Sequence, residues 1–579
     1  MRAARAKGTP ARNRKKVTRL SDEEKKKRRI KRDHAKLVRS TFRSAGFKVI
    51  LSICDKEFSY GGVTSDLDDV YVYENIIVFA ELTTSQESGV SDHIKKKKFL
   101  FDKILSSPIA FVEHMQNQFV DLKEAIPSIY HKTQYEVRLL YCSLNNVKSE
   151  LKEQFEGVKF FDFSIAKYFE SVTSTVRSSG RHELLSFLEI ESSRVGERAI
   201  APSEHRTSVY PGSILPEAHS NFGDGFKVVS FYINPGAVLE RCYVLRKRGW
   251  RSGDSTYQRL IDKKKISSIR KYLVDKERVF INNIIVTLPD DTKLLSGDGD
   301  TIDPKSIVQT VPGRVQIPQK YNTIGIIDGQ HRVFSYHEGG SQEDKIASLR
   351  ERQNLLVTGI VFPSSMSEKD RLKFEANLFL EINSNQTNAK SDLKQEINLV
   401  IHPFSSESIA KRILNSLNDS AGPLRDMFER YFYDSNKLKT TSIVSFAIRP
   451  LVNPGSSSSI FAMWDNDDKY SMMDNADYSL LSEYVAFCAR EINHIFAAIK
   501  ALLPSERWTA DKKVASRFLT TTNVNGIIFC LRLLASNKRL YSVREYMELF
   551  DGVEEFDFSE YKSSQYNKLS QKLYSEFLE

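Results

Sequence analysis

The spacing of apolar residues along the first third of the chain follows two alternating patterns. Residues 34–46 place apolar side chains at helical spacing and end at Gly46, a residue suited to a helix C-terminus. Short apolar runs rich in β-branched residues follow as far as residue 195. We expect strands at 47–53, 67–72, 75–83, 135–143 and 158–163, and a helix at 182–188. This alternation predicts an α/β domain over residues 34–195.

The following stretch, residues 196–225, loses that periodicity. It collects turn-forming and helix-breaking residues, namely Pro202, Pro211, Gly212, Pro216, Gly223 and Gly225. Clusters of proline and glycine between periodic segments are typical of loops. We therefore predict a linker between two domains.

From residue 226 onward the chain again alternates between strand-like and helix-like stretches. Strands are expected at 227–233, 280–288 and 321–327, and helices at 264–273 and 366–383. This indicates a mixed α/β domain with a small sheet over residues 226–450. Later segments, including 478–503 and 515–534, have helical spacing and predict a helical C-terminal region over 451–579. The expected fold class is α/β multidomain, because 579 residues exceed the ~250–300 that one core serves.

Charge is concentrated at the N-terminus. Residues 1–33 hold 15 Lys and Arg against four acids, which accounts for the whole net charge of +11. A basic segment with few apolar residues is expected to be disordered or marginally helical, and to bind DNA through release of counterions. The predicted contacts are Arg14, Lys15, Lys16, Arg28 and Arg29. The alternative is a tail that serves solubility alone.

Two further properties bear on location. No apolar stretch approaches the ~20 residues that a membrane span needs, and the basic N-terminus has no apolar signal region. The five cysteines are scattered singly and form no CxxC pair. They are expected to be reduced core residues of a cytoplasmic protein.

The most distinctive motif is the run from Asp328 to Arg332, of sequence Asp-Gly-Gln-His-Arg. It lies between a predicted strand and a predicted helix, where backbone N–H groups and the helix dipole favour an anion. Gly329 allows close approach of a phosphate, and His331 and Arg332 add donors. Asp328 does not suit a pure phosphate cradle, which points to Mg²⁺ or to chemistry.

Two neighbouring segments complete an ordered set. Thr256–Ile261 contains Tyr257, Gln258 and Arg259, and Phe379–Thr387 contains Asn383, Asn385 and Gln386. Together with the central motif, they resemble the DGQHR-domain family, which includes the DndB-like proteins of DNA phosphorothioation systems. That family is related to the ParB/sulfiredoxin fold. The resemblance covers roughly residues 226–450.

This resemblance implies a module that binds, and is expected to hydrolyse, ATP or another NTP while working on DNA. Gly329, Gln330, His331 and Arg332 would contact phosphates, and Asp328 would serve a metal or a water. The amides of Asn383, Asn385 and Gln386 would act as base or sugar donors, with Tyr257, Gln258 and Arg259 in the same cleft. Simpler roles stay open: Tyr257 as a core residue, Arg259 as an ion-pair partner of Asp328, and Asn383 as a helix cap. No Walker A motif is present.

The N-terminal domain carries a second pattern. An acid, Asp69 or its neighbour Asp68, stands in one predicted strand, and Glu81-x-Thr83 ends the next. A helix followed by this meander resembles the core of PD-(D/E)xK, restriction endonuclease-like enzymes. The resemblance implies that Asp69 and Glu81 hold Mg²⁺ for phosphodiester cleavage.

One position departs from that pattern. The lysine that should follow the second acid by two residues is Thr83. The next helix contains Lys95, Lys96, Lys97 and Lys98, and we expect Lys95 or Lys97 to return a lysine to the site. The alternative is that the acids cap a strand and the lysines form a solvated face.

Three functions follow. The favoured one is a DNA-directed, NTP-using factor of a bacterial DNA-modification or antiphage defence system, with partners from the same operon. The others are a Mg²⁺-dependent DNA endonuclease gated by the DGQHR domain, and a DNA-binding regulator without enzymatic activity. Phosphate release measured with and without DNA distinguishes them.

Overall fold

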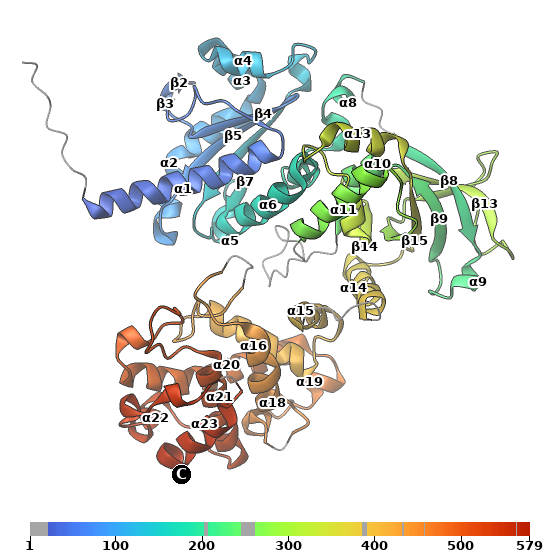
Figure 1. The fold of residues 1–579 in the computed structure, drawn as a ribbon. Helices are drawn as coiled ribbons and strands as arrows, with labels where there is room; N and C mark the ends of the chain where they lie inside the picture. The colour runs from blue at the N-terminus through green and yellow to red at the C-terminus, as the bar shows by residue number, and fades with distance from the viewer. Residues whose placement is uncertain are drawn as a thin grey trace, which may run out of the picture. The chain divides into compact units, whose positions relative to one another are not determined.

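In the computed structural model the chain divides into two compact units (Figure 1). The first comprises residues up to 202 except 185–187 and 191–193, which belong with residues 203–579 in the second. The structure describes residues 21–201, 207–244, 261–384, 391–430, 434–456, 458–562 and 564–579. In the described parts, no helix combines the length and apolar character needed to cross a membrane.

The first unit is built on a five-stranded sheet in the order β1-β4-β5-β6-β7. The central strand, β5 (Ile76–Thr83), pairs antiparallel with β4 (Asp69–Tyr73) and parallel with β6 (Glu136–Ser143). The outer strands are β1 (Lys48–Val49) and β7 (Val158–Asp162). The predicted strands are therefore confirmed. β1 is shorter than expected because the chain turns between residues 51 and 55.

Helices cover both faces of this sheet. On one face lie α1 (Asp22–Ser44) and α6 (Phe163–Val176), where Phe42 stacks on Tyr71 with ring centroids 4.0 Å apart. On the other face, α2 (Glu87–Ser106) and α3 (Pro108–Gln118) share a hydrophobic core with strand residues such as Phe79. Because side chains alternate along a strand, neighbouring residues of β4 and β5 face different helix layers.

Of the N-terminal basic segment, the structure describes residues 21–33. Residues 22–33, predicted to be disordered or marginally helical, form the first half of α1. Ser21 and Glu24 form a capping box at its start, and exposed i,i+4 ion pairs such as Lys27–Glu23 offset the repulsion between like charges. Arg28 and Arg29 lie on this helix, whereas Arg14, Lys15 and Lys16 fall outside the described residues.

The second unit contains an eight-stranded mixed sheet in the order β10-β14-β11-β15-β9-β8-β13-β12, larger than the small sheet predicted. Its strands are β8 (Thr207–Leu215), β9 (Lys227–Ile233), β10 (Cys242–Val244), β11 (Ile284–Leu288), β12 (Lys293–Leu295), β13 (Val311–Pro318), β14 (Ile324–Asp328) and β15 (Leu355–Val361). The accompanying helices are α10 (Pro235–Arg241), α11 (Lys263–Lys276), α12 (Gln330–Phe334), α13 (Glu343–Arg352) and α14 (Glu368–Ser384).

The predicted linker at 196–225 is wrong for its central part. Residues 207–215 form β8, which pairs with both β9 and β13 inside the sheet. Gly212 is required there, because a Cβ at this position would lie 2.3 Å from the carbonyl oxygen of Ser230. Pro211 lies in the same strand, opposite Arg314. The residues that resembled a loop therefore allow close approach of strands instead.

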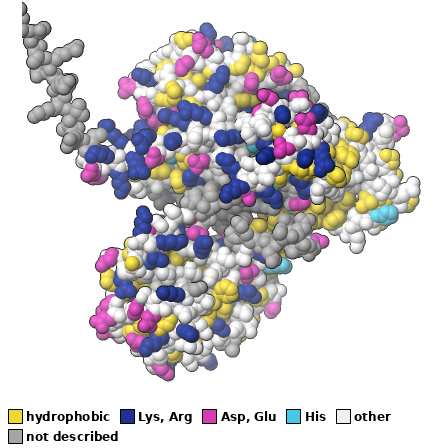
Figure 2. Space-filling model, in the orientation of Figure 1, with side chains coloured by type: hydrophobic (Ala, Val, Ile, Leu, Met, Phe, Trp, Pro, Cys, Tyr) yellow, Lys and Arg dark blue, Asp and Glu magenta, His cyan; other side chains and the backbone are white. Residues whose placement is uncertain are grey.

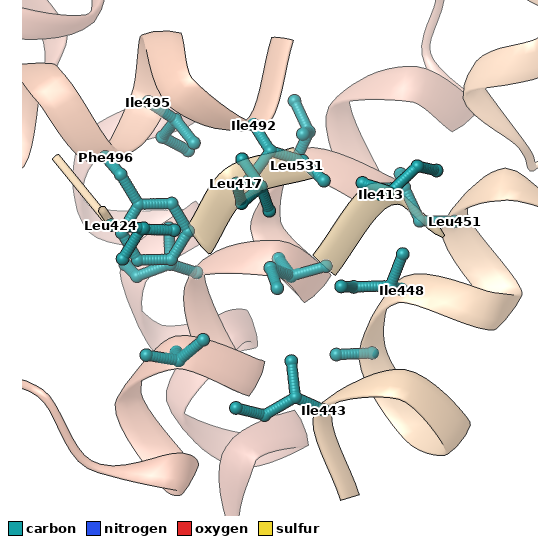
Figure 3. Packing of buried hydrophobic residues seen from close by; sticks show 14 of the residues in the cluster. Ile413, Leu417, Leu424, Ile443, Ile448, Leu451, Ile492, Ile495, Phe496 and Leu531 are labelled. Carbon is teal, nitrogen blue, oxygen red and sulfur yellow. The ribbon is translucent and has the colours of Figure 1, made fainter. Parts of the chain in front are cut away.

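The helical C-terminal region begins earlier than the predicted boundary at residue 451. One hydrophobic cluster joins α16 (Ser406–Asp419) and the helical segment 440–452 to α20 (Tyr478–Leu502) and α21 (Thr521–Ser536). Figure 3 shows Ile413, Ile448 and Leu531 meeting in this core. The break between sheet domain and helical region consequently lies before α16, because residues on both sides of 450 share one core.

The five cysteines are all free thiols, and none forms a disulfide. Cys142, Cys488 and Cys530 are buried as expected, whereas Cys54 and Cys242 are half-buried. Burial raises the pKa of the Cys54 thiol to about 12, with a contribution from the hydrogen bond to Asp69, so this thiol stays protonated near neutral pH.

Candidate functional site

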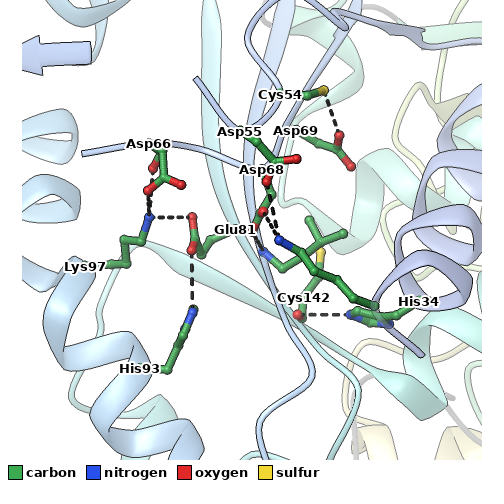
Figure 4. A network of polar contacts seen from close by, with 12 residues as sticks. His34, Cys54, Asp55, Asp66, Asp68, Asp69, Glu81, His93, Lys97 and Cys142 are labelled. Atoms are coloured by element: carbon green, nitrogen blue, oxygen red, sulfur yellow. Dashed lines mark hydrogen bonds and ion pairs between the residues drawn. The ribbon is translucent and has the colours of Figure 1, made fainter. Parts of the chain in front are cut away.

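Two buried carboxylates meet between adjacent strands of the first unit (Figure 4). Asp69 of β4 pairs with Ala80 of β5, which places the preceding Asp68 beside Glu81. The backbone N–H of Leu82 donates a 2.7 Å hydrogen bond to Asp68 Oδ2. Asp68 and Glu81 both face the α2 layer because they have the same place in the strand alternation.

Asp69 is not part of this pair, which corrects the expected metal ligand. Its side chain points to the opposite face, where the guanidinium of Arg39 donates at 2.8 Å to Oδ1. The hydroxyl of Tyr71 donates to Oδ2 at 2.8 Å, and the Cys54 thiol donates to Oδ1 at 3.1 Å. Asp69 is fully buried. It therefore links α1 to the sheet as part of a structural ion pair, and the alternative acid Asp68 is the one that lies beside Glu81.

A lysine does reach the acid pair from α2. Lys97 Nζ lies 3.1 Å from Glu81 Oε2 and 2.7 Å from Asp66 Oδ1, and it donates to the Asp66 carbonyl at 2.9 Å. Thr83 donates its hydroxyl hydrogen bond to Ser85 instead. Lys95 is exposed on α2. Of the two predicted lysines, only Lys97 is brought to Glu81.

The electrostatics of the pair show an excess of negative charge. Burial, followed by the nearby Asp68, raises the pKa of Glu81 to about 8 despite Lys97. Burial likewise raises the pKa of Asp68 to about 6. The hydrogen bond from the Leu82 N–H and the positive charge of Lys31 act in the opposite direction and lower this pKa. The hydrogen bond from Lys97 holds the pKa of Asp66 below its usual range. Glu81 thus keeps its proton near neutral pH unless further positive charge arrives, and Asp68 keeps its proton to a higher pH than an ordinary aspartate.

A histidine that sequence reasoning missed completes the arrangement. His93 stands one turn before Lys97 on α2, and its Nε2 lies 3.7 Å from Glu81 Oε1. Its Nδ1 lies 2.9 Å from the Tyr141 hydroxyl, which fixes the ring. Burial, with Lys97 and Lys96, lowers the pKa of His93, so the ring is neutral near pH 7. The i,i+4 spacing of His93 and Lys97 was the available signal.

The donor set suits a hard divalent cation. Carboxylate oxygens are the ligands that Mg²⁺ prefers, and Mg²⁺ keeps several waters instead of a full protein cage. In the part of the chain that the structure describes, no group of three or more His, Cys, Asp or Glu residues is arranged to hold a metal. The raised pKa values of Asp68 and Glu81 indicate a shortage of positive charge, which such an ion would correct. The pair therefore fits Mg²⁺ held partly by water or substrate.

In the DGQHR turn of the second unit, the acidic and basic side chains pair with each other. β14 ends at Asp328, and Gly329 adopts a positive φ of 98° before the five-residue helix α12. Only glycine fits, since a Cβ would lie 2.5 Å from a methyl carbon of Ile284. Arg332 donates a 2.7 Å hydrogen bond to Asp328 Oδ2. The predicted phosphate contact and the predicted metal partner are thus paired with each other.

The side chains of His331 and Gln330 take no part in the ion pair between Asp328 and Arg332. The His331 ring lies near Asp262, whose pKa is lowered first by the backbone N–H groups of Lys265 and Lys264 and then by His331. Gln330 is buried, and neither end of its amide has a hydrogen-bond partner among the described residues. Buried amides nearly always have partners, so this one calls for an explanation.

The chain after α12 is held by buried arginine. Arg270 of α11 donates to the carbonyls of Ser335 and His337 and pairs with Glu343 at 2.8 Å. Arg350 of α13 binds the other oxygen of Glu343 at 2.6 Å. These contacts fix the path that leads out of the DGQHR turn.

Most of the remaining predicted residues of this module fall outside the part of the chain that the structure describes. Tyr257, Gln258, Arg259, Asn385 and Gln386 lie outside the described residues. The backbone of Asn383 belongs to the last turn of α14.

The comparisons with known proteins place no relative beside this chain. No protein-family model, curated protein or solved structure matches it.

Proposed function

We propose that the first unit cleaves phosphodiester bonds in DNA with the help of Mg²⁺. The observation that carries this proposal is the position of Lys97 Nζ, 3.1 Å from Glu81 Oε2, beside the buried pair formed with Asp68. A lysine and two acids at the end of paired strands form the constellation that the PD-(D/E)xK resemblance implies, with the lysine supplied by a helix.

In this proposal Asp68 and Glu81 would hold Mg²⁺. When bound, the ion polarises the scissile phosphate and makes a bound water more acidic. Lys97 would place its ammonium where negative charge develops on the phosphate, in a buried setting where that interaction is strong. Asp66 would keep Lys97 charged and correctly placed, because it forms the shorter of the two ion pairs.

A plasmid-nicking assay tests this directly. Supercoiled DNA is incubated with the full-length protein and Mg²⁺ or Mn²⁺, and Glu81→Gln and Lys97→Ala are compared with wild type. Loss of one transition-state charge contact is expected to slow nicking by on the order of 10²–10³ in Lys97→Ala. Lys95→Ala is the matched control, since it removes the same charge from the exposed face of the same helix.

Two outcomes would contradict the proposal. Wild-type protein that nicks no DNA under these conditions would make the first unit a binding platform. Equal rates for Lys97→Ala and Lys95→Ala would show that the lysine beside Glu81 takes no part in cleavage.

A second candidate concerns the DGQHR turn. We propose that it binds a nucleotide such as ATP, and that the buried Gln330 amide is retained for that purpose. The full protein would then be a DNA-directed factor of a bacterial DNA-modification or defence system, acting in the cytoplasm. His331→Ala and Arg332→Ala should each weaken ATP binding at least tenfold, the usual effect of losing a charge-assisted contact. Unchanged ATP affinity in both variants would exclude the turn.

A further inference from the structure

One cation at the acid pair comes from a helix to which the proposed mechanism gives no role. Lys31 of α1 places its Nζ 3.7 Å from Asp68 Oδ1 and 3.4 Å from Asp55 Oδ1. The Lys31 side chain is 62% exposed. The Lys31–Asp55 pair is exposed on both sides, and the ammonium of the Lys31–Asp68 pair also lies in solvent, so stability gives little reason for the position of Lys31.

The helix that carries Lys31 continues outward as a basic surface. All residues of α1 from Asp22 to Asp33 are exposed. Figure 2 shows Lys and Arg side chains gathered over this end of α1. At 100° per residue, Lys27 and Arg28 lie one turn before Lys31 on the same side, whereas Lys25 and Lys26 face away.

The basic residues on the two sides of α1 have similar ion-pair partners. Lys27 pairs with Glu23 at 2.9 Å, and Lys25 pairs with Asp22 at 2.8 Å, and both pairs are exposed. Arg28 and Lys26 make no ion pair or side-chain hydrogen bond with another described residue. What differs is direction, because only the side with Lys27 and Arg28 leads to Lys31 and the acid pair.

We infer that Lys27, Arg28 and Lys31 form a track along which a DNA strand reaches the Asp68–Glu81 pair. The spacing suits that partner. Four residues of helix rise about 6 Å, which is one to two phosphate intervals of a duplex strand, counted as ~3.4 Å each along the duplex axis. Lys31 would neutralise a phosphate at the site, and Lys27 and Arg28 would hold the next ones. The α1 residues at this end are almost all polar, which favours a polyanion over a lipid surface.

This inference rests on the proposed function for the identity of the site, and its test is kept independent of cleavage. Binding of a fluorescent 20-base-pair duplex is measured in full-length Glu81→Gln protein over a range of salt concentrations. Lys27→Gln/Arg28→Gln is compared with the matched control Lys25→Gln/Lys26→Gln. Each double variant removes two positive charges, one from an ion-paired residue and one from a residue that has no ion-pair partner in the part of the chain that the structure describes.

The track variant is expected to lose at least tenfold in affinity and about 0.9 per lost contact in the slope of log K against log salt. The control should stay within about twofold of the parent protein. Equal losses in the two double variants would overturn the track, since net charge alone would then explain binding. Preferential binding of anionic phosphatidylglycerol vesicles through the same two residues would also overturn the track. If wild type fails to nick plasmid while the two variants differ in binding, the cleavage proposal falls and the track stands.

Discussion

The DGQHR turn and the acid pair of the first unit handle charge in opposite ways. In the turn, Asp328 and Arg332 are four residues apart and neutralise each other across one turn of backbone. In the first unit, Asp68 and Glu81 stand 13 positions apart in the sequence and are brought together with like charge. Their partner Lys97 comes from a different element and also serves Asp66.

The difference shows which of the two motifs still has charged groups that are not neutralised within the folded protein. A local ion pair satisfies its own charges, so it needs nothing from outside. Two buried carboxylates with raised pKa values are short of positive charge, and a cation or a phosphate-bound metal would supply it. In its charged groups, the more conspicuous sequence motif is thus the better neutralised one in the structure, whereas the less conspicuous pattern keeps two carboxylates with raised pKa values.

The strongest challenge to this comparison separates Asp68 from Asp69. Asp68→Asn should reduce plasmid nicking by at least 10²-fold while the protein stays folded, because it removes one carboxylate of the pair. Asp69→Asn should instead destabilise the first unit by on the order of 3–5 kcal/mol, since it leaves Arg39 without its buried charge. Nicking rates are compared per folded molecule, with unfolding followed by circular dichroism. A larger catalytic loss in Asp69→Asn would reverse the assignment.

A second prediction concerns pH. Glu81 has a folded-state pKa of about 8 against a usual 4.5, so between these values the folded protein holds a proton that the unfolded chain has lost. Stability is therefore greatest below pH 4.5 for this group and falls as pH rises through 8. Glu81→Gln cannot titrate and should gain on the order of 2–4 kcal/mol over wild type at pH 9.

Thermal unfolding measured between pH 5 and pH 9 checks this expectation. The advantage of Glu81→Gln should be small at pH 5 and grow with pH. Mg²⁺ should stabilise wild type more than Glu81→Gln at pH 9, because the ion binds the ionised pair in the folded state. Parallel stability curves for the two proteins would mean that Glu81 is charged throughout.

The smallest effect is expected in the second unit. Gln330→Leu replaces a buried amide that has no hydrogen-bond partner among the described residues, and should stabilise the protein by on the order of 1 kcal/mol. Gln395 is a matched control, because its buried amide nitrogen donates to the Thr441 carbonyl at 3.2 Å and to Ser445 Oγ at 2.8 Å. Gln395→Leu should destabilise the protein by a similar amount.

Both variants are followed by differential scanning calorimetry. If Gln330 serves a nucleotide, Gln330→Leu should also lose ATP affinity, and Gln395→Leu should not. Loss of stability in Gln330→Leu would show that the Gln330 amide has hydrogen-bond partners within the protein. The amide would then no longer support a ligand at the turn.

The sequence alone was sufficient for the elements whose pattern is local. The strand at 227–233 and the helix at 478–502 were predicted within a residue, because alternation and helical spacing depend on neighbours in the chain. The same holds for the turn at Gly329, where a strand, a glycine and a helix start are consecutive. The candidate acids and the lysine run were also visible as residue types.

Only the tertiary structure decided which of those residues meet. The choice of Asp68 over Asp69 depends on strand register, since a shift of one position sends a side chain to the other face of the sheet. The choice of Lys97 over Lys95 depends on how α2 is rotated against β5. β8 was not predicted, because Pro211 and Gly212 taken by themselves indicate a loop. In the structure the backbone of Ser230 lies so close that only glycine fits at position 212 of the strand. Contacts between segments far apart in the chain leave no periodic trace in the sequence, and these are the contacts that form the site.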